Sequence, residues 1–134
     1  YWLELDIPDI NQDGFLDEEI ILTINNVYPA NPNQIYHLGE GANLISYIIP
    51  YEQSVSNSIP DEMEGYFTSF IGSAAAASQL TPNFWVGNLQ NMKKQKGYWA
   101  ILDLSDCPIS DNPDNGECYQ DNFGNIILKF YWNN

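Results

Sequence analysis

The sequence contains no arginine, and only four lysines accompany eighteen acidic residues, so the formal net charge is −14. Such a chain repels nucleic acid and anionic membrane surfaces, whereas it attracts divalent cations that neutralise clustered carboxylates. The shortage of positive charge therefore excludes nucleic acid as a partner. The sequence also lacks any apolar run of about 18 residues, so it predicts no membrane span.

His37 is the single histidine, so a catalytic triad or a histidine-based metal site would have to rest on it alone. The sequence has no Gly-rich phosphate loop and no His-Glu-x-x-His zinc motif. No feature singles out two of the carboxylates as a glycosidase pair. We therefore expect a protein that is not an enzyme, in which His37 is a strand residue with an ordinary hydrogen bond.

Cysteine is equally scarce, because Cys107 and Cys118 are the only two. They enclose a polar loop that contains proline, glycine and asparagine, and no further thiol or imidazole lies near them to complete a zinc site. This pattern predicts a disulfide, which places the protein outside the cytosol. Because the chain starts at Tyr1 and not at methionine, we interpret it as a processed or excised product.

The acidic residues are unevenly distributed, with seven in the first nineteen positions and no basic residue among them. Calcium takes six to eight oxygen ligands on a compact loop, with side-chain ligands at alternate positions and a glycine at the sharp turn. Residues 9–17 fit this pattern, with Gly14 at the turn. The predicted ligands are Asp9, Asn11, Asp13, the Phe15 carbonyl, Asp17 and Glu19.

The twelfth position of this loop, which normally carries a bidentate carboxylate, is Ile20. Either Glu19 reaches the ion through an altered backbone path, or another carboxylate such as Asp6 completes the shell. A second acidic stretch at Asp111–Asp121 could form a looser calcium site, but we favour a solvated turn that the disulfide holds in place.

Alternating apolar residues in Tyr1–Asp6 predict a half-buried strand, and the apolar spacing of Glu18–Tyr28 favours a short helix. One helical turn is expected at Pro60–Glu64, capped by Ser58. Further strands are predicted at Ile35–Leu38, Asn43–Ile49, Tyr66–Ile71, Phe84–Val86, Tyr98–Leu104 and Ile126–Trp132. The sequence thus predicts a single, mainly β domain over residues 1–134. It is a small β-sandwich with a calcium loop and one short helix near the N-terminus (residues 1–30), followed by a β module (residues 31–134).

The string Asp-Ile-Asn-Gln-Asp-Gly-Phe-Leu-Asp at residues 9–17 resembles the calcium loop of dockerin type I repeats in secreted bacterial proteins. Dockerins carry two such loop–helix units, whereas this chain has one. Residues 41–47 and 85–99 resemble a β module that accompanies dockerin-like loops in large exported bacterial proteins, over roughly residues 35–102. The resemblance implies a cell-surface or extracellular location. Cohesin binding is what the dockerin family would imply, and the β module implies no particular activity.

Two functions follow from these features. The first is a non-catalytic, calcium-stabilised structural module that self-assembles as a surface or filament subunit through its terminal strands, Tyr1–Asp6 and Ile126–Trp132. A terminal strand can equally pair within its own domain. The alternative is a carbohydrate- or partner-binding module, because the tryptophans and tyrosines could form a sugar-stacking platform as well as a core. The lysines at 93, 94 and 96 form either a solvated turn or a contact with an acidic patch on a neighbouring copy.

Overall fold

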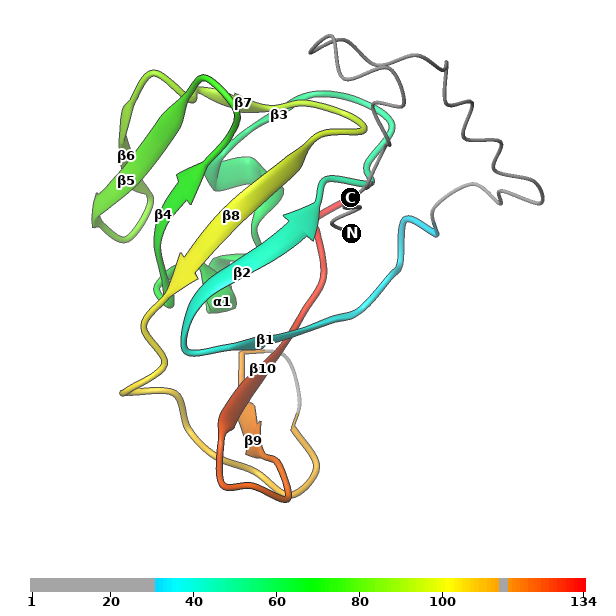
Figure 1. Cartoon of the computed structure of the whole chain (residues 1–134), viewed down its shortest axis with the longest axis vertical. Helices are drawn as coiled ribbons and strands as arrows, with labels where there is room; N and C mark the ends of the chain where they lie inside the picture. The colour runs from blue at the N-terminus through cyan, green and yellow to red at the C-terminus, as the bar shows by residue number, and fades with distance from the viewer. Residues whose placement is uncertain (1–30, 114–115) are drawn as a thin grey trace, which may run out of the picture.

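The computed structural model describes residues 31–113 and 116–134 (Figure 1). The predicted strand Tyr1–Asp6, the calcium loop and the predicted helix Glu18–Tyr28 lie outside the described residues. The described part is mainly β, as predicted, with antiparallel sheets packed together as a small sandwich and one short α-helix. No helix in this part is long and apolar enough to cross a membrane.

The largest sheet has five antiparallel strands. In spatial order the strands are β2 (Gly41–Ser46), β8 (Gly97–Leu102), β4 (Phe67–Ile71), β5 (Ala76–Thr81) and β6 (Phe84–Gly87). β6 and β2 are therefore the edge strands of this sheet. Short turns join β4 to β5 and β5 to β6, whereas β8 comes from farther along the chain and inserts between β2 and β4.

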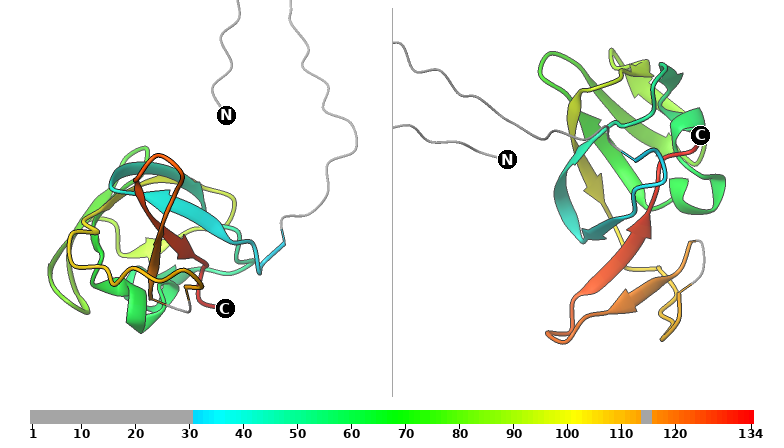
Figure 2. Two further views of the ribbon diagram at one scale, coloured as in Figure 1. Left: turned by 90° about the horizontal axis from the view of Figure 1, so that it is seen from below. Right: turned by 90° about the vertical axis from the view of Figure 1, so that its right-hand side faces the viewer.

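A second, three-stranded sheet contains β1 (Tyr36–Gly39), β10 (Ile126–Phe130) and β9 (Cys118–Gln120), with β10 in the middle. The C-terminal strand β10 is thus paired on both sides within its own chain. Of the two predicted alternatives, this is pairing within the domain and not donation of the strand to a neighbouring copy. Figure 2 shows that β9 and the adjoining part of β10 project beyond the five-stranded sheet. A two-stranded sheet pairs β3 (Gln53–Ser54) with β7 (Asn91–Met92).

The helical turn predicted near residue 60 is present as α1 (Asp61–Glu64), but its predicted cap is wrong. The N-cap residue is Pro60 and makes no side-chain cap hydrogen bond. The Ser58 hydroxyl instead donates to the Val55 carbonyl at 2.7 Å, within the 3₁₀ turn η1 (Ser56–Ser58). A short serine side chain beside a tight turn satisfies a nearby carbonyl before it can reach the next helix.

The core lies between the sheets and is rich in aromatic side chains. Phe67 on β4 and Phe130 on β10 join the two larger sheets with ring centroids 5.0 Å apart. Trp132 packs edge-on against Phe130 at 4.9 Å and against Tyr47 at 5.0 Å. All of these side chains are fully buried. Aromatic pairs in this geometry contribute about 0.5–1.5 kcal/mol beyond the burial of their area, so β10 and the residues after it hold the sheets together.

Candidate interaction surface

The predicted calcium loop cannot be placed on the fold, because its residues lie outside the described part of the chain. This applies to each predicted ligand: Asp9, Asn11, Asp13, Phe15, Asp17 and Glu19. Across residues 31–113 and 116–134, no three or more histidine, cysteine, aspartate or glutamate side chains gather in a way that could hold a metal ion. The calcium site therefore stays a prediction from the sequence.

The predicted disulfide between Cys107 and Cys118 is confirmed, with Cα atoms 5.9 Å apart. Both cysteines are buried. The Ser110 amide donates to the Cys118 carbonyl and the Cys118 amide donates to the Pro108 carbonyl, each at 2.8 Å, so the first part of the loop pairs with β9. The Tyr66 hydroxyl donates to the Gly116 carbonyl at 2.9 Å and ties the loop to the main body.

Asp121, at the end of the acidic stretch Asp111–Asp121, organises the turn between β9 and β10. Its Oδ1 accepts hydrogen bonds from the amides of Phe123 at 2.8 Å and Asn125 at 2.9 Å. Its Oδ2 accepts from the Asn125 side-chain amide at 2.9 Å. Hydrogen bonds from Asn125, its side chain first, lower the pKa of this carboxyl. Both carboxylate oxygens thus hold the turn between β9 and β10, next to the disulfide-bonded Cys118.

The lowered pKa of Asp121 predicts a pH dependence of this turn. A carboxyl whose pKa is lower in the folded state stabilises the fold above its unfolded pKa of about 3.9. That contribution disappears as pH falls through the lower folded pKa. We expect the Phe123 and Asn125 amide resonances to shift in an acid NMR titration with a midpoint below about 3.9. Asp121→Asn should abolish the shift and Asp111→Asn should preserve it, whereas a midpoint at or above that value contradicts the assignment.

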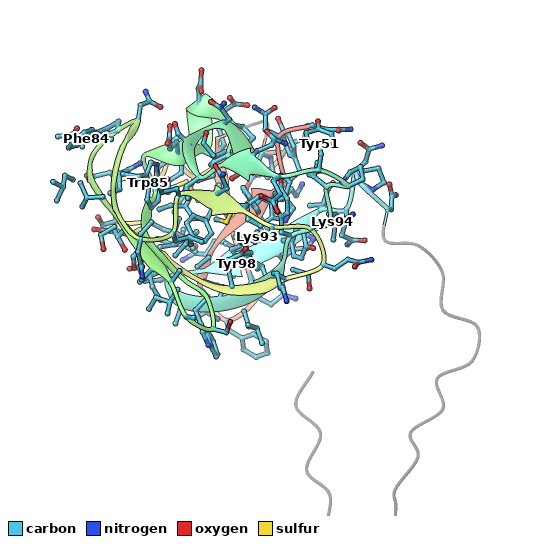
Figure 3. All side chains as sticks on the ribbon, turned by 90° about the horizontal axis from the view of Figure 1, so that it is seen from above. Tyr51, Phe84, Trp85, Lys93, Lys94 and Tyr98 are labelled. Carbon is cyan, nitrogen blue, oxygen red and sulfur yellow. A yellow bond between two sulfur atoms is a disulfide. The ribbon has the colours of Figure 1, made fainter. Side chains whose placement is uncertain are left out.

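His37 is a strand residue with an ordinary hydrogen bond, as predicted. It lies on β1, where its Nδ1 is 2.9 Å from the Tyr119 hydroxyl and its ring meets the Tyr119 ring edge-on. The three lysines near residue 95 form the predicted exposed turn, between β7 and β8. The Lys93 amide donates to the Tyr98 hydroxyl at 2.9 Å, and Figure 3 shows this turn well apart from Phe84 on β6.

Glu64 is a buried carboxylate that the sequence did not single out. Its Oε1 accepts the indole N–H of Trp85 at 2.6 Å, and its backbone carbonyl accepts from the Gln79 side chain at 3.2 Å. Its Oε2 has no hydrogen-bond partner among the described residues. The contact fixes the indole of Trp85 on β6 against the C-terminal end of α1, so it orients an edge strand of the main sheet.

The outward face of the five-stranded sheet exposes large apolar side chains. Cross-strand pairing places Leu44 on β2 opposite Trp99 on β8, and Trp99 opposite Ile71 on β4, so these three form a row. A second group of exposed apolar side chains consists of Leu80 on β5 and of Phe84 and Val86 on β6, and the small residues Ser69, Ala76 and Ser78 lie between the two groups. Trp99 is 38% exposed, Phe84 56% and Leu80 64%. We call this surface the apolar face; its large members are Leu44, Ile71, Leu80, Phe84, Val86 and Trp99.

The apolar face carries no charge, because none of the five strands contains an aspartate, glutamate or lysine. None of the eighteen acidic residues of the chain falls within these five strands in the sequence. The remaining outward residues are neutral as well: Ala42, Ser46, Ser69, Ala76, Ser78, Gly97 and Ile101. Groups of large exposed apolar side chains on one uncharged sheet face mark an interaction site more often than single scattered apolar residues do. The alternation of apolar and polar residues in the sequence did not predict the apolar face, because apolar residues occupy both sides of these strands.

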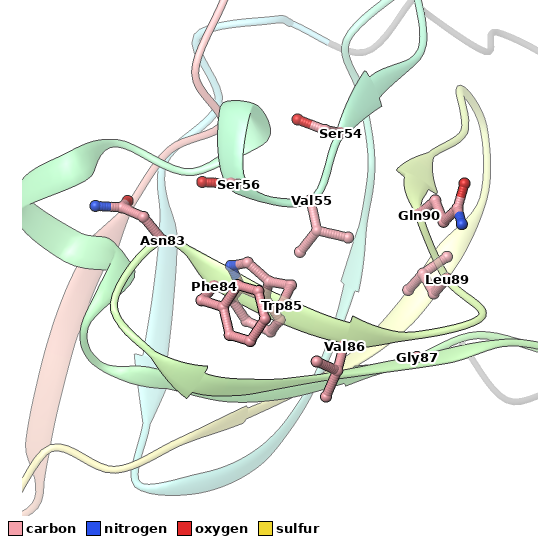
Figure 4. A pocket seen from close by; sticks show the side chains of 10 residues that line it. All are labelled: Ser54, Val55, Ser56, Asn83, Phe84, Trp85, Val86, Gly87, Leu89 and Gln90. Carbon is pink, nitrogen blue, oxygen red and sulfur yellow. The ribbon is translucent and has the colours of Figure 1, made fainter.

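A groove lies along the open edge of β6 (Figure 4). One wall is β6 itself with Asn83, and the other is formed by Ser54–Ser56 and Leu89–Gln90. Its volume is about 450 Å³ and no lining residue is charged. Val55 and Leu89 are buried and Trp85 is half-buried, so the deeper part of the groove is apolar.

No family model, no curated protein and no solved structure matches this chain. The fold and the exposed surface define a small, mainly β protein that has a disulfide bond and an uncharged, apolar sheet face.

Proposed function

We propose that this chain is a non-catalytic, calcium-stabilised structural module of an extracellular or cell-surface assembly, and that its copies associate through the apolar face. The observation that carries the proposal is the absence of charge from a five-stranded sheet that exposes six large apolar side chains, in a chain of net charge −14. The buried disulfide supports an extracellular location, since such bonds persist in oxidising compartments.

Electrostatics favours a second copy on this face. Two molecules of charge −14 repel each other, and the cost is smallest where the contact keeps carboxylates apart. Burial of apolar surface contributes roughly 25 cal/mol per Å². Two identical faces can close around a two-fold axis, as sheets do when they pack face to face about 10 Å apart.

The size of the face limits the strength of this contact. Five strands about 4.8 Å apart make a surface only roughly 20 Å wide, and its outward side chains come from short strands. Strands of four to six residues are at most roughly 20 Å long, so the face covers at most about 400 Å², half of the roughly 800 Å² per partner of a standard stable interface. We therefore expect a weak dimer that becomes populated at high local concentration, as on a cell surface.

Sedimentation at increasing protein concentration, with calcium present, tests the proposal. The wild-type chain should shift from monomer to dimer, and added salt should strengthen the association because it screens the repulsion of acidic surfaces. Trp99→Glu should reduce association at least tenfold, and Leu44→Glu should do the same if the first variant folds poorly. Circular dichroism checks the fold of both.

Phe123→Glu is the matched control, because Phe123 is 90% exposed in the turn between β9 and β10, away from the apolar face. It introduces the same charge and should leave association unchanged. A wild-type chain that stays monomeric at every concentration, or a Trp99→Glu variant that associates normally, contradicts the proposal.

The exposed indole of Trp99 also supports the second candidate function, a carbohydrate- or partner-binding module. Its row neighbours Leu44 and Ile71 are apolar, whereas a sugar site combines an aromatic surface with convergent polar groups. For this reason we prefer a second copy as the partner. Retention on a polysaccharide affinity gel that Trp99→Ala abolishes and Phe123→Ala preserves would favour the sugar.

A further inference from the structure

The edge strand β6 has β5 on one side and no strand on its other side among the described residues. Ala76 directs its N–H to the Asn88 side chain and accepts the Leu89 amide at its carbonyl, so its backbone faces the β6 side of β5. Backbone groups alternate along a strand, so Ser78 and its partner Val86 bond each other. Trp85 and Gly87, on either side of Val86, therefore point their N–H and C=O groups toward the groove.

Edge strands in soluble proteins are usually protected by charge, proline or covering segments. The sequence of β6 is Phe-Trp-Val-Gly, which has no charge and no proline. A Cβ at Gly87, whose φ is +133°, would collide with the Ala76 carbonyl oxygen, so glycine lets the two backbones approach closely here. The strand ends at this residue, and its open side is short.

The other edges of the two larger described sheets are at least partly covered. On β2, the Ser46 carbonyl accepts hydrogen bonds from the Tyr36 hydroxyl at 2.9 Å and the Trp132 indole at 2.7 Å. On β9, the segment Pro108–Ser110 pairs with Cys118. On β1, the Asn43 side chain bonds both backbone groups of Gly39. β6 is the edge that opens into a groove with an apolar floor.

We propose that β6 accepts an added strand in this groove, and that the strand is Tyr1–Asp6 of a second copy of the chain. This inference rests on the proposed self-assembly and assigns it a second contact. Strand addition combines main-chain hydrogen bonds with pockets for alternate side chains. In the sequence of this segment, Tyr1, Leu3 and Leu5 alternate with Trp2, Glu4 and Asp6.

That alternation matches the groove. Tyr1, Leu3 and Leu5 fall on one side of an extended strand and can cover the floor formed by Val55, Trp85 and Leu89. The two acidic residues of the segment meet no charge in the groove lining. The C-terminal strand cannot act as the donor, because β10 is already paired on both sides.

The assembly that follows has a defined symmetry. A donor segment and an acceptor groove at different places on the chain make a heterologous contact, which propagates head to tail unless a ring closes. Together with the two-fold contact of the apolar face, such a contact makes a filament of paired molecules.

The test uses the full chain, labelled with ¹⁵N, and a synthetic hexapeptide with the sequence of Tyr1–Asp6. We expect the peptide to cause the largest amide chemical-shift changes at Trp85 and Gly87. It should bind the Ser56→Glu protein at least fivefold more weakly than wild type and bind the Asn122→Glu protein as wild type does. Ser56 lines the groove and Asn122 lies in the exposed turn between β9 and β10. A peptide with Leu3→Glu and Leu5→Glu should not bind. Equal binding to both protein variants, or no shift on β6 at millimolar peptide, overturns the inference.

Two further measurements separate this inference from the proposed function. The Trp99→Glu protein should bind the peptide as wild type does, and the full-chain variant L3E/L5E should still dimerise in sedimentation but form nothing larger. Suppose that the wild-type protein dimerises and Trp99→Glu does not, while the peptide leaves the β6 amides unaffected. That result contradicts strand addition in the groove and leaves the proposed association through the apolar face intact. If L3E/L5E changes the β6 amides in dilute monomer, the segment comes from its own chain, and the second copy is rejected.

Discussion

Replacing Phe130 with alanine is expected to lower the free energy of unfolding by about 3–5 kcal/mol. Phe130 is fully buried and lies within 5.0 Å of Phe67 and 4.9 Å of Trp132, ring centroid to centroid. It extends from the middle strand of the three-stranded sheet toward β4 of the five-stranded sheet. Its loss leaves a cavity between the two sheets, which the surrounding strands cannot close without losing their own pairing.

Urea or thermal unfolding, followed by circular dichroism, measures this effect. Phe123→Ala removes the same side chain from a position that is 90% exposed, and it should change stability by no more than about 0.5 kcal/mol. A loss below about 1 kcal/mol for Phe130→Ala contradicts the packing described for this core.

Removing calcium is expected to lower the melting temperature substantially. An ion that binds only the folded state stabilises it by about 2.7 kcal/mol when its free concentration is a hundredfold above Kd. Without the ion, Asp9, Asp13 and Asp17 are close in sequence and repel one another. Calorimetry with calcium and then with excess chelator measures the difference.

The variant Asp9→Asn with Asp13→Asn should melt at the same temperature in calcium and in chelator. Asp111→Asn, which removes one carboxylate from the other acidic stretch, should keep the full response to calcium. An unchanged melting temperature of the wild type in chelator would count against the calcium loop, while loss of the response in Asp111→Asn would move the site to the acidic stretch near the disulfide.

Much of the fold follows from local sequence. Each strand predicted within the described residues is present, because segments such as Ile126–Trp132 combine β-branched and aromatic residues. The strand β5 was missed, since Ala76–Thr81 has little intrinsic β preference and forms through pairing with β4 and β6. The short strands β3 and β7 were missed because each pairs with the other across a long stretch of sequence, and β9 was missed because it has only three residues and forms through pairing with β10.

The candidate surface was harder to predict than the fold. Alternation identifies an exposed side by its polar residues, but Leu44 and Trp99 lie on the exposed side of strands whose other side is also apolar. One signal was available in the sequence: the strand segments at 41–46, 67–71, 76–81, 84–87 and 97–102 lack charge in a strongly acidic chain. The Cys107–Cys118 pair was predictable because so few partners were available to either cysteine.

The position of β10 has a consequence for the order in which the protein forms. β10 is the last of the described strands, yet it separates β1 from β9, and Trp132, two residues after it, is buried in the core. The ribosome synthesises the N-terminal strands first. β1 and β9 therefore lack their shared partner β10, and the core lacks Trp132, until residue 132 has emerged. The three-stranded sheet, and the disulfide loop attached to it through Cys118, can therefore close only after all five strands of the larger sheet have been made.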